Sequence, residues 1–198
     1  MKYAENISAL MKLPIDMMGL IFYPKSPRYV SQDDLTDCCS SHSSIQRVGV
    51  FVNADLDEIL EKVSQYKLNM IQLHGNESPD FSKALKEKIP VIKAFSVGQK
   101  EDFEQCEKYE GACNYFLFDT KTPQYGGSGQ KFDWQILEAY RGATPFLLSG
   151  GISEEDASAL KEIRHPMLYG IDLNSRFEIE AGLKNISLLE KFIKEIKS

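Results

Sequence analysis

The sequence lacks the features that assign a chain to a membrane, secreted or metal-binding class. Its longest apolar run, residues 17–23, is far below the roughly 20 residues that span a bilayer, so no membrane association is expected. Its four cysteines show no CxxC spacing, so neither a disulfide framework nor a metal site is predicted. An early Glu5 and no uninterrupted apolar stretch at the start argue against a secretory signal. We therefore expect a cytoplasmic protein with reduced thiols.

Acidic residues outnumber basic ones, and the common nucleotide-binding loop motifs are absent from the sequence. The 198 residues carry 23 Lys and Arg against 29 Asp and Glu, a net charge of −6, with no basic stripe for a phosphate backbone. Neither GxGxxG after a first strand nor a Walker loop occurs, which weakens the case for a nucleotide-binding doubly wound sheet. We expect no nucleic-acid partner and instead a small molecule.

Along the sequence, short apolar runs typical of strands alternate strictly with segments that have helical periodicity. Seven near-continuous apolar runs predict parallel strands covered on both faces, at 16–22, 46–52, 69–73, 90–95, 114–119, 145–149 and 167–172. Seven segments with helical spacing, and the weakly periodic segment 32–40, predict eight helices. Repeated β–α units require right-handed crossovers in a parallel sheet. Residues 1–198 are thus predicted to form one α/β domain, a (β/α)₈ TIM barrel lacking its first strand.

Polar side chains stand where these strands end, which is where such barrels form their active sites. Asp119 follows the apolar run YFLF and is either a turn cap or an acid aimed into a site. His74, in QLHG, is either an acid–base group or a structural histidine. Arg28, in SPRYV, offers a planar fork for a carboxylate, or is a solvated loop arginine.

The segment LLSGGISEEDA predicts an anion site. Gly150 and Gly151 separate a strand from a helix that Ser153 can cap, so backbone N–H groups and the helix dipole can meet an anion. Ser175, in the IDLNS segment one strand later, can complete the site, because barrels often bind phosphate after their last two strands. A plain tight turn is the alternative interpretation.

Six motifs in order along the chain resemble the phosphoribosylanthranilate isomerase family: IFYPKSPRYV, VGVFVN, QLHGNES, FDTKTPQYGGSGQKFDW, LLSGGI and GIDLNSRFE. The resemblance implies an Amadori rearrangement of N-(5-phosphoribosyl)anthranilate in tryptophan biosynthesis, an aldose–ketose isomerisation without a cofactor. Carried over by motif, Asp119 matches the general acid and Arg28 the ligand of the anthranilate carboxylate. Other matched positions are expected to contact substrate, at Asp172 and His74, or its phosphate, at Gly150, Gly151, Asn174 and Ser175.

The sequence departs from the family in one important respect. The family's general base is a cysteine in a Lys-x-Cys-Gly motif, which would precede the residues matched by Met1 and Lys2. The chain as given is thus expected to lack both the first strand and the base, and with them full activity. The alternatives are a non-catalytic phosphosugar-binding barrel and another phosphosugar enzyme whose marker residues are absent. Unpaired edges beside the missing strand predict a homo-oligomer, strand exchange or an unstable monomer.

Overall fold

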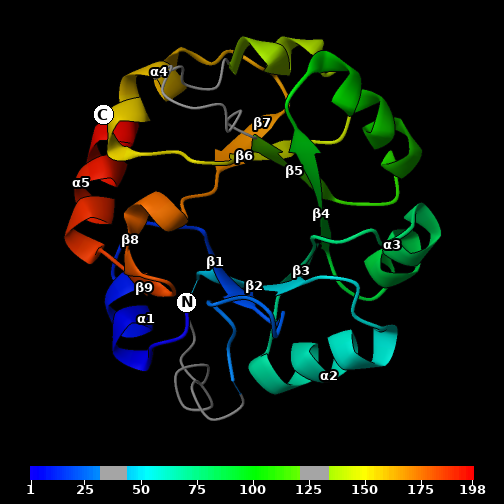
Figure 1. Cartoon of the computed structure of the whole chain (residues 1–198), viewed down its shortest axis with the longest axis horizontal. Coiled ribbons are helices and arrows are strands. Elements are labelled where there is room, and N and C mark those ends of the chain that lie inside the picture. The colour runs from blue at the N-terminus through cyan, green and yellow to red at the C-terminus, as the bar shows by residue number, and fades with distance from the viewer. Residues whose placement is uncertain (32–43, 121–133) are drawn as a thin grey trace.

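The computed structural model describes residues 1–31, 44–120 and 134–198, which form a curled sheet of strands surrounded by helices (Figure 1). Seven strands make up the sheet: β1 (Met17–Ile21), β2 (Gln46–Phe51), β3 (Met70–Leu73), β4 (Val91–Val97), β5 (Tyr115–Thr120), β6 (Phe146–Ser149) and β7 (Leu168–Ile171). The surrounding helices are α1 (Ala4–Leu10), α2 (Leu56–Tyr66), α3 (Pro79–Lys86), η1 (Lys100–Tyr109), η2 (Trp134–Ala139), η3 (Glu154–Asp156), α4 (Ala157–Glu162) and α5 (Ile186–Lys197), where η denotes a 3₁₀-helix.

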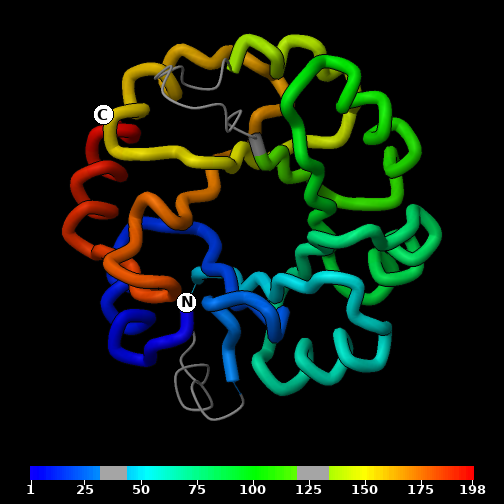
Figure 2. The backbone as a smooth tube through the Cα atoms, in the orientation of Figure 1, coloured from blue at the N-terminus to red at the C-terminus, as the bar shows by residue number. Residues whose placement is uncertain are grey.

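The strands pair in chain order, β1 to β7, and every pairing is parallel. This confirms the predicted α/β class and the seven predicted strands. The sheet curls until β7 lies across from β1, but within the three described ranges these two strands do not pair. The tube in Figure 2 follows the same curl. The structure therefore shows seven parallel strands in a curled, open sheet.

Seven of the eight predicted helices coincide with helical elements, and the eighth, at 32–40, lies outside the described residues. Two of the seven, η1 and η2, are 3₁₀-helices rather than α-helices. Their apolar anchors recur every three residues, at Phe103 and Cys106 and at Trp134, Leu137 and Tyr140. Because a 3₁₀-helix has three residues per turn, this spacing places each set on one face.

The core has two layers. Apolar side chains between the sheet and the helices form the larger one, with Phe116, Phe118 and Phe146 fully buried. A smaller cluster lies on the inner side of the curled sheet and is formed by Val48, Met70, Ile92, Ala94, Leu117 and Leu147. Burial on both faces explains why the central strands are almost continuously apolar. Within the described ranges, no helix is both long and apolar enough to cross a membrane.

A short antiparallel hairpin after β7 did not figure in the sequence prediction. Its strands are β8 (Glu178–Glu180) and β9 (Leu183–Lys184), joined at Gly182, which has a positive φ of 88°. It lies next to α1 on the open side of the ring (Figure 1). Asn6 on α1 exchanges two hydrogen bonds with the Lys184 backbone, at 2.8 and 2.9 Å, so the hairpin ties the first helix to the end of the chain.

Candidate active site

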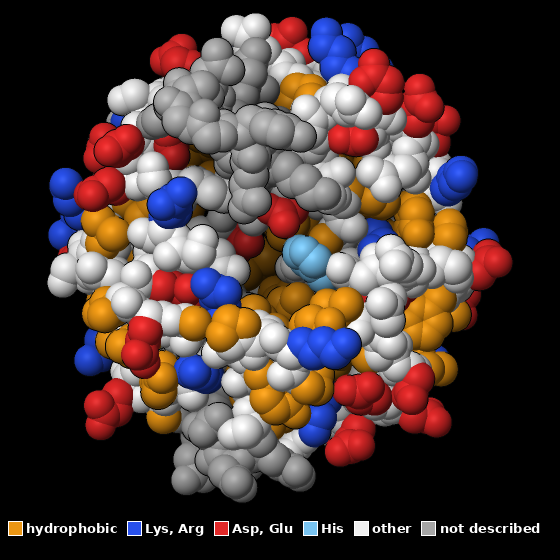
Figure 3. Space-filling model, viewed as in Figure 1, with side chains coloured by type: hydrophobic (Ala, Val, Ile, Leu, Met, Phe, Trp, Pro, Cys, Tyr) orange, Lys and Arg blue, Asp and Glu red, His pale blue; other side chains and the backbone are white. Residues whose placement is uncertain are grey.

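A cavity of about 930 Å³ opens at the carboxyl ends of the strands and continues along the open side of the sheet. Figure 3 shows the hollow at the centre of this face, with apolar surface inside it and acidic and histidine side chains at its edge. Its walls extend past β1 and β7 to the apolar sides of α1 and α5, through Leu10, Phe192 and Ile193. All eight site residues predicted from the sequence line this cavity: Arg28, His74, Asp119, Gly150, Gly151, Asp172, Asn174 and Ser175.

Asp119 and His74 face each other at the mouth of the cavity. Asp119 pairs in register with Ser149 on β6, and His74 follows β3. The His74 Nε2 atom lies 3.9 Å from Asp119 Oδ2, and both side chains are about 40% exposed. The Gln72 amide donates to His74 Nδ1 at 2.9 Å, which leaves the proton of a neutral imidazole on Nε2, facing the carboxylate. The pair can therefore pass protons to and from a bound molecule.

The backbone after β6 turns at the two glycines that the sequence places there, a conformation that fits both a tight turn and an anion site. Gly150 and Gly151 have φ values of 102° and 67°, which side chains rarely allow, so the chain turns sharply into η3. Ser153 N and Oγ donate to the Asp156 carboxylate at 2.8 and 2.9 Å, the capping arrangement expected from the sequence. Both glycines line the cavity with Ser175, so their backbone amides stand beside it.

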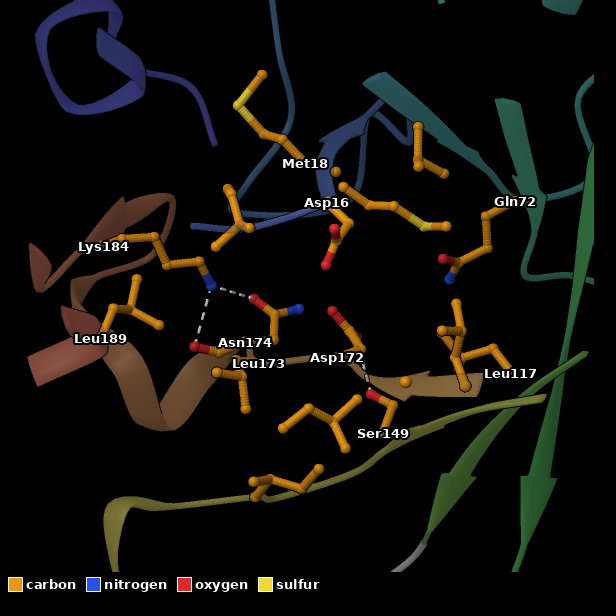
Figure 4. Close-up of a pocket in the computed structure, with 18 of the residues that line it drawn as sticks. Asp16, Met18, Gln72, Leu117, Ser149, Asp172, Leu173, Asn174, Lys184 and Leu189 are labelled. Carbon is orange, nitrogen blue, oxygen red and sulfur yellow. Dashed lines mark hydrogen bonds between the residues drawn. The ribbon is translucent and has the colours of Figure 1, made fainter. Parts of the chain in front are cut away.

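Asp172 is fixed by the neighbouring strand. Its backbone N–H donates to the Leu148 carbonyl at 2.8 Å, and Ser149 Oγ donates to Asp172 Oδ2 at 2.9 Å. In the close-up of Figure 4 the labelled Asp172 and Ser149 side chains meet at this bond inside the cavity wall. The second carboxylate oxygen thus remains on the cavity side for a hydroxyl or amine donor.

Arg28 reaches the cavity but is bound along one edge by Glu178 of the hairpin. Its Nη2 and Nε donate to Glu178 Oε2 at 2.6 and 2.9 Å. Burial raises the pKa of the Glu178 carboxyl, but the Arg28 hydrogen bonds and the Lys184 charge outweigh it and hold this pKa below its usual value. The carboxylate is therefore ionised at neutral pH and keeps Arg28 in place.

Lys184 is a cavity residue that the sequence reasoning missed. Its Nζ donates to Asn174 O and Oδ1 at 3.0 and 2.9 Å (Figure 4). The same amine donates to Glu178 Oε1 at 3.2 Å. Burial lowers the pKa of this amine, and Glu178 opposes the shift. The signal was present in the sequence, because FEIEAGLK, two short segments around a glycine, is typical of a hairpin. The hairpin thus supplies Glu178 and Lys184 to the site.

Neither cysteine in the described ranges reaches the cavity. Cys106 is on η1 and Cys113 precedes β5, and both are buried in the outer core. Burial raises the pKa of Cys106 to about 12 and that of Cys113 to about 11. Cys38 and Cys39 lie outside the described residues. Their burial outside the cavity and their raised pKa values make Cys106 and Cys113 unsuited to act as a base on a molecule bound there at neutral pH.

Alkylation should report this burial. At pH 8 we expect Cys106 and Cys113 to react with iodoacetamide at least tenfold more slowly in the folded chain than in urea, since a raised pKa leaves about one thiol in a thousand or fewer as thiolate. Their reactivity should rise as the pH approaches 11. Mass spectrometry of the two cysteine peptides measures this, and equal rates in folded and unfolded chain would contradict it.

Comparison with known proteins shows which family the chain belongs to. A family model described as N-(5'phosphoribosyl)anthranilate (PRA) isomerase matches residues 1–195. The N-(5'-phosphoribosyl)anthranilate isomerase of Parabacteroides distasonis is 50% identical, over 99% of this chain and 90% of that protein. The chain belongs to the phosphoribosylanthranilate isomerase family. The sequence resemblance and the assignment to an isomerase family are confirmed.

Crystal structures of the family have the same fold. The phosphoribosylanthranilate isomerase of Thermotoga maritima superposes with a TM-score of 0.86 at 35% identity, covering 100% of this chain and 95% of the other. A second structure, in complex with reduced 1-(o-carboxyphenylamino)-1-deoxyribulose 5-phosphate, has a TM-score of 0.83 at 31% identity, covering 100% and 95%. The ligand of that structure carries, by its name, both a carboxyl group and a phosphate.

Proposed function

We propose that this chain isomerises N-(5-phosphoribosyl)anthranilate to 1-(2-carboxyphenylamino)-1-deoxyribulose 5-phosphate in the cytoplasmic synthesis of tryptophan. The observation that carries this proposal is the meeting, in one cavity, of the Asp119 carboxylate, the Gly150–Gly151 turn and the Arg28 guanidinium. These groups suit the three parts of the substrate, a sugar ring to be opened, a phosphate and an aromatic carboxylate. Family membership and the ligand of the second related crystal structure support the same assignment.

Asp119 is proposed as the general acid. It protonates the furanose ring oxygen as the bond from that oxygen to C1′ breaks, which leaves a Schiff base between C1′ and the anthranilate nitrogen. A base then removes the C2′ proton to give an enolamine. Addition of a proton at C1′ and loss of the proton from the C2′ hydroxyl give the ketone. Protons move and no electrons leave the substrate, so no cofactor is needed. His74, 3.9 Å from Asp119, is proposed to contact the substrate beside the acid.

The remaining groups are proposed to bind the ends of the substrate. Amides of Gly150 and Gly151, with Asn174 and Ser175, bind the phosphate, because positive-φ glycines let backbone N–H groups approach an anion closely. Arg28 binds the anthranilate carboxylate, and Asp172 accepts from the sugar or the bridging amine.

The open sheet bears on the general base. We propose that the fold is a (β/α)₈ barrel whose remaining strand, not present among the described residues, fits between β7 and β1 and carries a cysteine into the cavity. Tyr169 on β7 is 57% exposed and Gly19 on β1 is also exposed, as expected of strands that lack a covering neighbour. Such edges also favour association of two copies by strand exchange.

An isomerisation assay tests this function. Residues 1–198 are compared with a chain extended at its N-terminus by a strand ending in Lys-x-Cys-Gly, and with the same extension carrying alanine for cysteine. We expect the cysteine extension to raise kcat/KM at least tenfold over both other chains, since the alanine extension closes the sheet without supplying a base. Equal activity in all three chains would refute the proposal that a cysteine on an additional strand supplies the general base. Analogue binding without turnover in any of them would favour the non-catalytic phosphosugar-binding barrel.

A further inference from the structure

Among the described residues, the Arg28 guanidinium is hydrogen-bonded along one of its edges, by Glu178. Nε lies 3.1 and 2.9 Å from the two Glu178 oxygens, and Nη2 lies 2.6 Å from Oε2, so the bonds to Glu178 use the edge between Nε and Nη2. A guanidinium has five N–H donors in a planar fork. With respect to the described part of the chain, the end formed by Nη1 and Nη2 therefore keeps donors for a second carboxylate. The Arg28 side chain is 23% exposed and lines the cavity, whereas that of Glu178 is 3% exposed.

Glu178 is itself fixed by groups that leave it no freedom to swing away. Its Oε1 accepts from Lys184 Nζ and from the Gly182 backbone N–H, each at 3.2 Å. Lys184 completes its hydrogen bonding on Asn174, at 2.9 and 3.0 Å. The three side chains Arg28, Glu178 and Lys184, here called the Arg28 cluster, carry one net positive charge. That charge matches one carboxylate of a ligand.

We propose that Glu178 is a positioning residue, which holds the Arg28 guanidinium edge-on so that its free end binds the substrate carboxylate and selects for an ortho-carboxylated aromatic amine. This inference rests on the proposed function and deepens it. Arginine can hold two carboxylates at once because its side and its end each present two parallel N–H groups. Lys184 offsets the charge of Glu178, so the second carboxylate meets a positive cluster.

A positioning role and a simple charge role predict opposite signs. Replacing Glu178 by glutamine leaves the Arg28 cluster with two positive charges, so attraction alone would tighten carboxylate binding. Loss of orientation would weaken it, because a glutamine amide offers one acceptor oxygen and turns an N–H donor toward a guanidinium that can only donate. The direction of the change therefore decides between the two roles.

Calorimetry with two ligands measures that direction. One ligand is reduced 1-(o-carboxyphenylamino)-1-deoxyribulose 5-phosphate, and the other is its phenylamino counterpart without the carboxyl group. We expect the unaltered chain to prefer the carboxylated ligand by about tenfold or more, and Glu178→Gln to prefer it less than twofold. Glu178→Asp keeps the charge but shortens the side chain, and should also lose the preference.

Glu180 provides the matched control. It lies on the same strand, and its carboxylate accepts from Tyr3 at 2.6 Å instead of from Arg28. Glu180→Gln makes the same change in charge and should keep the full preference. If Glu178→Gln fails to fold, as judged by circular dichroism, Glu178→Asp decides the question.

The outcomes separate the two proposals. A preference that is kept or increased in the folded Glu178 variants overturns the positioning role while the proposed function stands. Binding of neither ligand to the unaltered chain overturns the proposed function, and this inference falls with it. Loss of the preference in the Glu178 variants, with Glu180→Gln unaffected, supports both.

Discussion

Asp119→Asn is expected to lower kcat for isomerisation by about 10²- to 10⁴-fold in the extended chain, with little change in KM. The amide has nearly the same shape as the carboxylic acid, so the cavity and the 3.9 Å approach of His74 should persist. What is lost is the proton that the furanose oxygen receives as the ring opens. Steady-state kinetics with purified substrate measure the effect.

Asp57 supplies the control for this substitution. It lies in the first turn of α2, exposed and away from the cavity, so Asp57→Asn should leave kcat within about twofold, as most surface changes do. Calorimetry with the reduced product analogue should show that Asp119→Asn still binds. A variant within threefold of normal kcat would contradict the role of Asp119 as the acid.

Loss of the Glu77 charge alone is expected to destabilise the fold by about 3–5 kcal/mol, because it leaves the buried ammonium of Lys93 without a counter-charge. Lys93 Nζ lies 3.1 Å from Glu77 Oε2, and both side chains are 3% exposed. The same ammonium donates to the Leu73 and Gly75 carbonyls at 3.2 and 2.7 Å. Glu77→Gln leaves the ammonium with carbonyls but with no counter-charge. Urea denaturation gives the free energy of unfolding.

Two further variants show whether charge is the cause. Glu77→Gln combined with Lys93→Met removes both charges and should recover most of the lost stability, since buried pairs replaced together are often nearly neutral. Glu61→Gln breaks an exposed ion pair, 3.7 Å from Lys62, and should cost less than about 1 kcal/mol. A single Glu77→Gln variant as stable as the double variant would exclude the stranded charge as the cause.

This buried pair also bears on the site. Glu77 accepts from the backbone N–H groups of Asn53 and Gly75, at 2.9 Å and at 3.0 to 3.1 Å, and so joins the loops after β2 and β3. His74 is at the start of the second loop. The position of His74 opposite Asp119 therefore depends on the buried Glu77–Lys93 pair, which holds the loop that His74 begins.

The sequence predicted the central strands best, because burial on both faces of the sheet requires them to be almost entirely apolar. The β4 segment is buried at six of its seven positions, and all of these except Lys93 are apolar, so its composition identified it as a strand. Chain order then determined the sheet, because consecutive parallel strands with helical crossovers have few arrangements. The Gly150–Gly151 turn and the strand-end Asp119 followed from that order, since every strand delivers its carboxyl end to the same face.

The sequence did not predict contacts between residues far apart along the chain, nor elements too short to show periodicity. Glu178 binds Arg28 across 150 positions, and no local pattern marks either residue as a partner of the other. Two-residue strands such as β9 are too short to show periodicity, so the hairpin was overlooked. The distinction between α and 3₁₀ in η1 depends on how the helix packs, which composition records poorly.

The bond between Asn6 and Lys184, described above as joining α1 to the hairpin, also bears on the order of folding. It closes a loop of 178 residues, whereas the β1–β2 pairing joins positions 29 apart, such as Met17 and Gln46. The entropy of closing the longer loop is less favourable by about 1.6 kcal/mol. The sheet can grow strand by strand as the chain is synthesised, but the ring closes only after Lys184 has emerged. A truncation before the hairpin should thus remove the two Asn6 hydrogen bonds and the packing of α1 against β9 and α5.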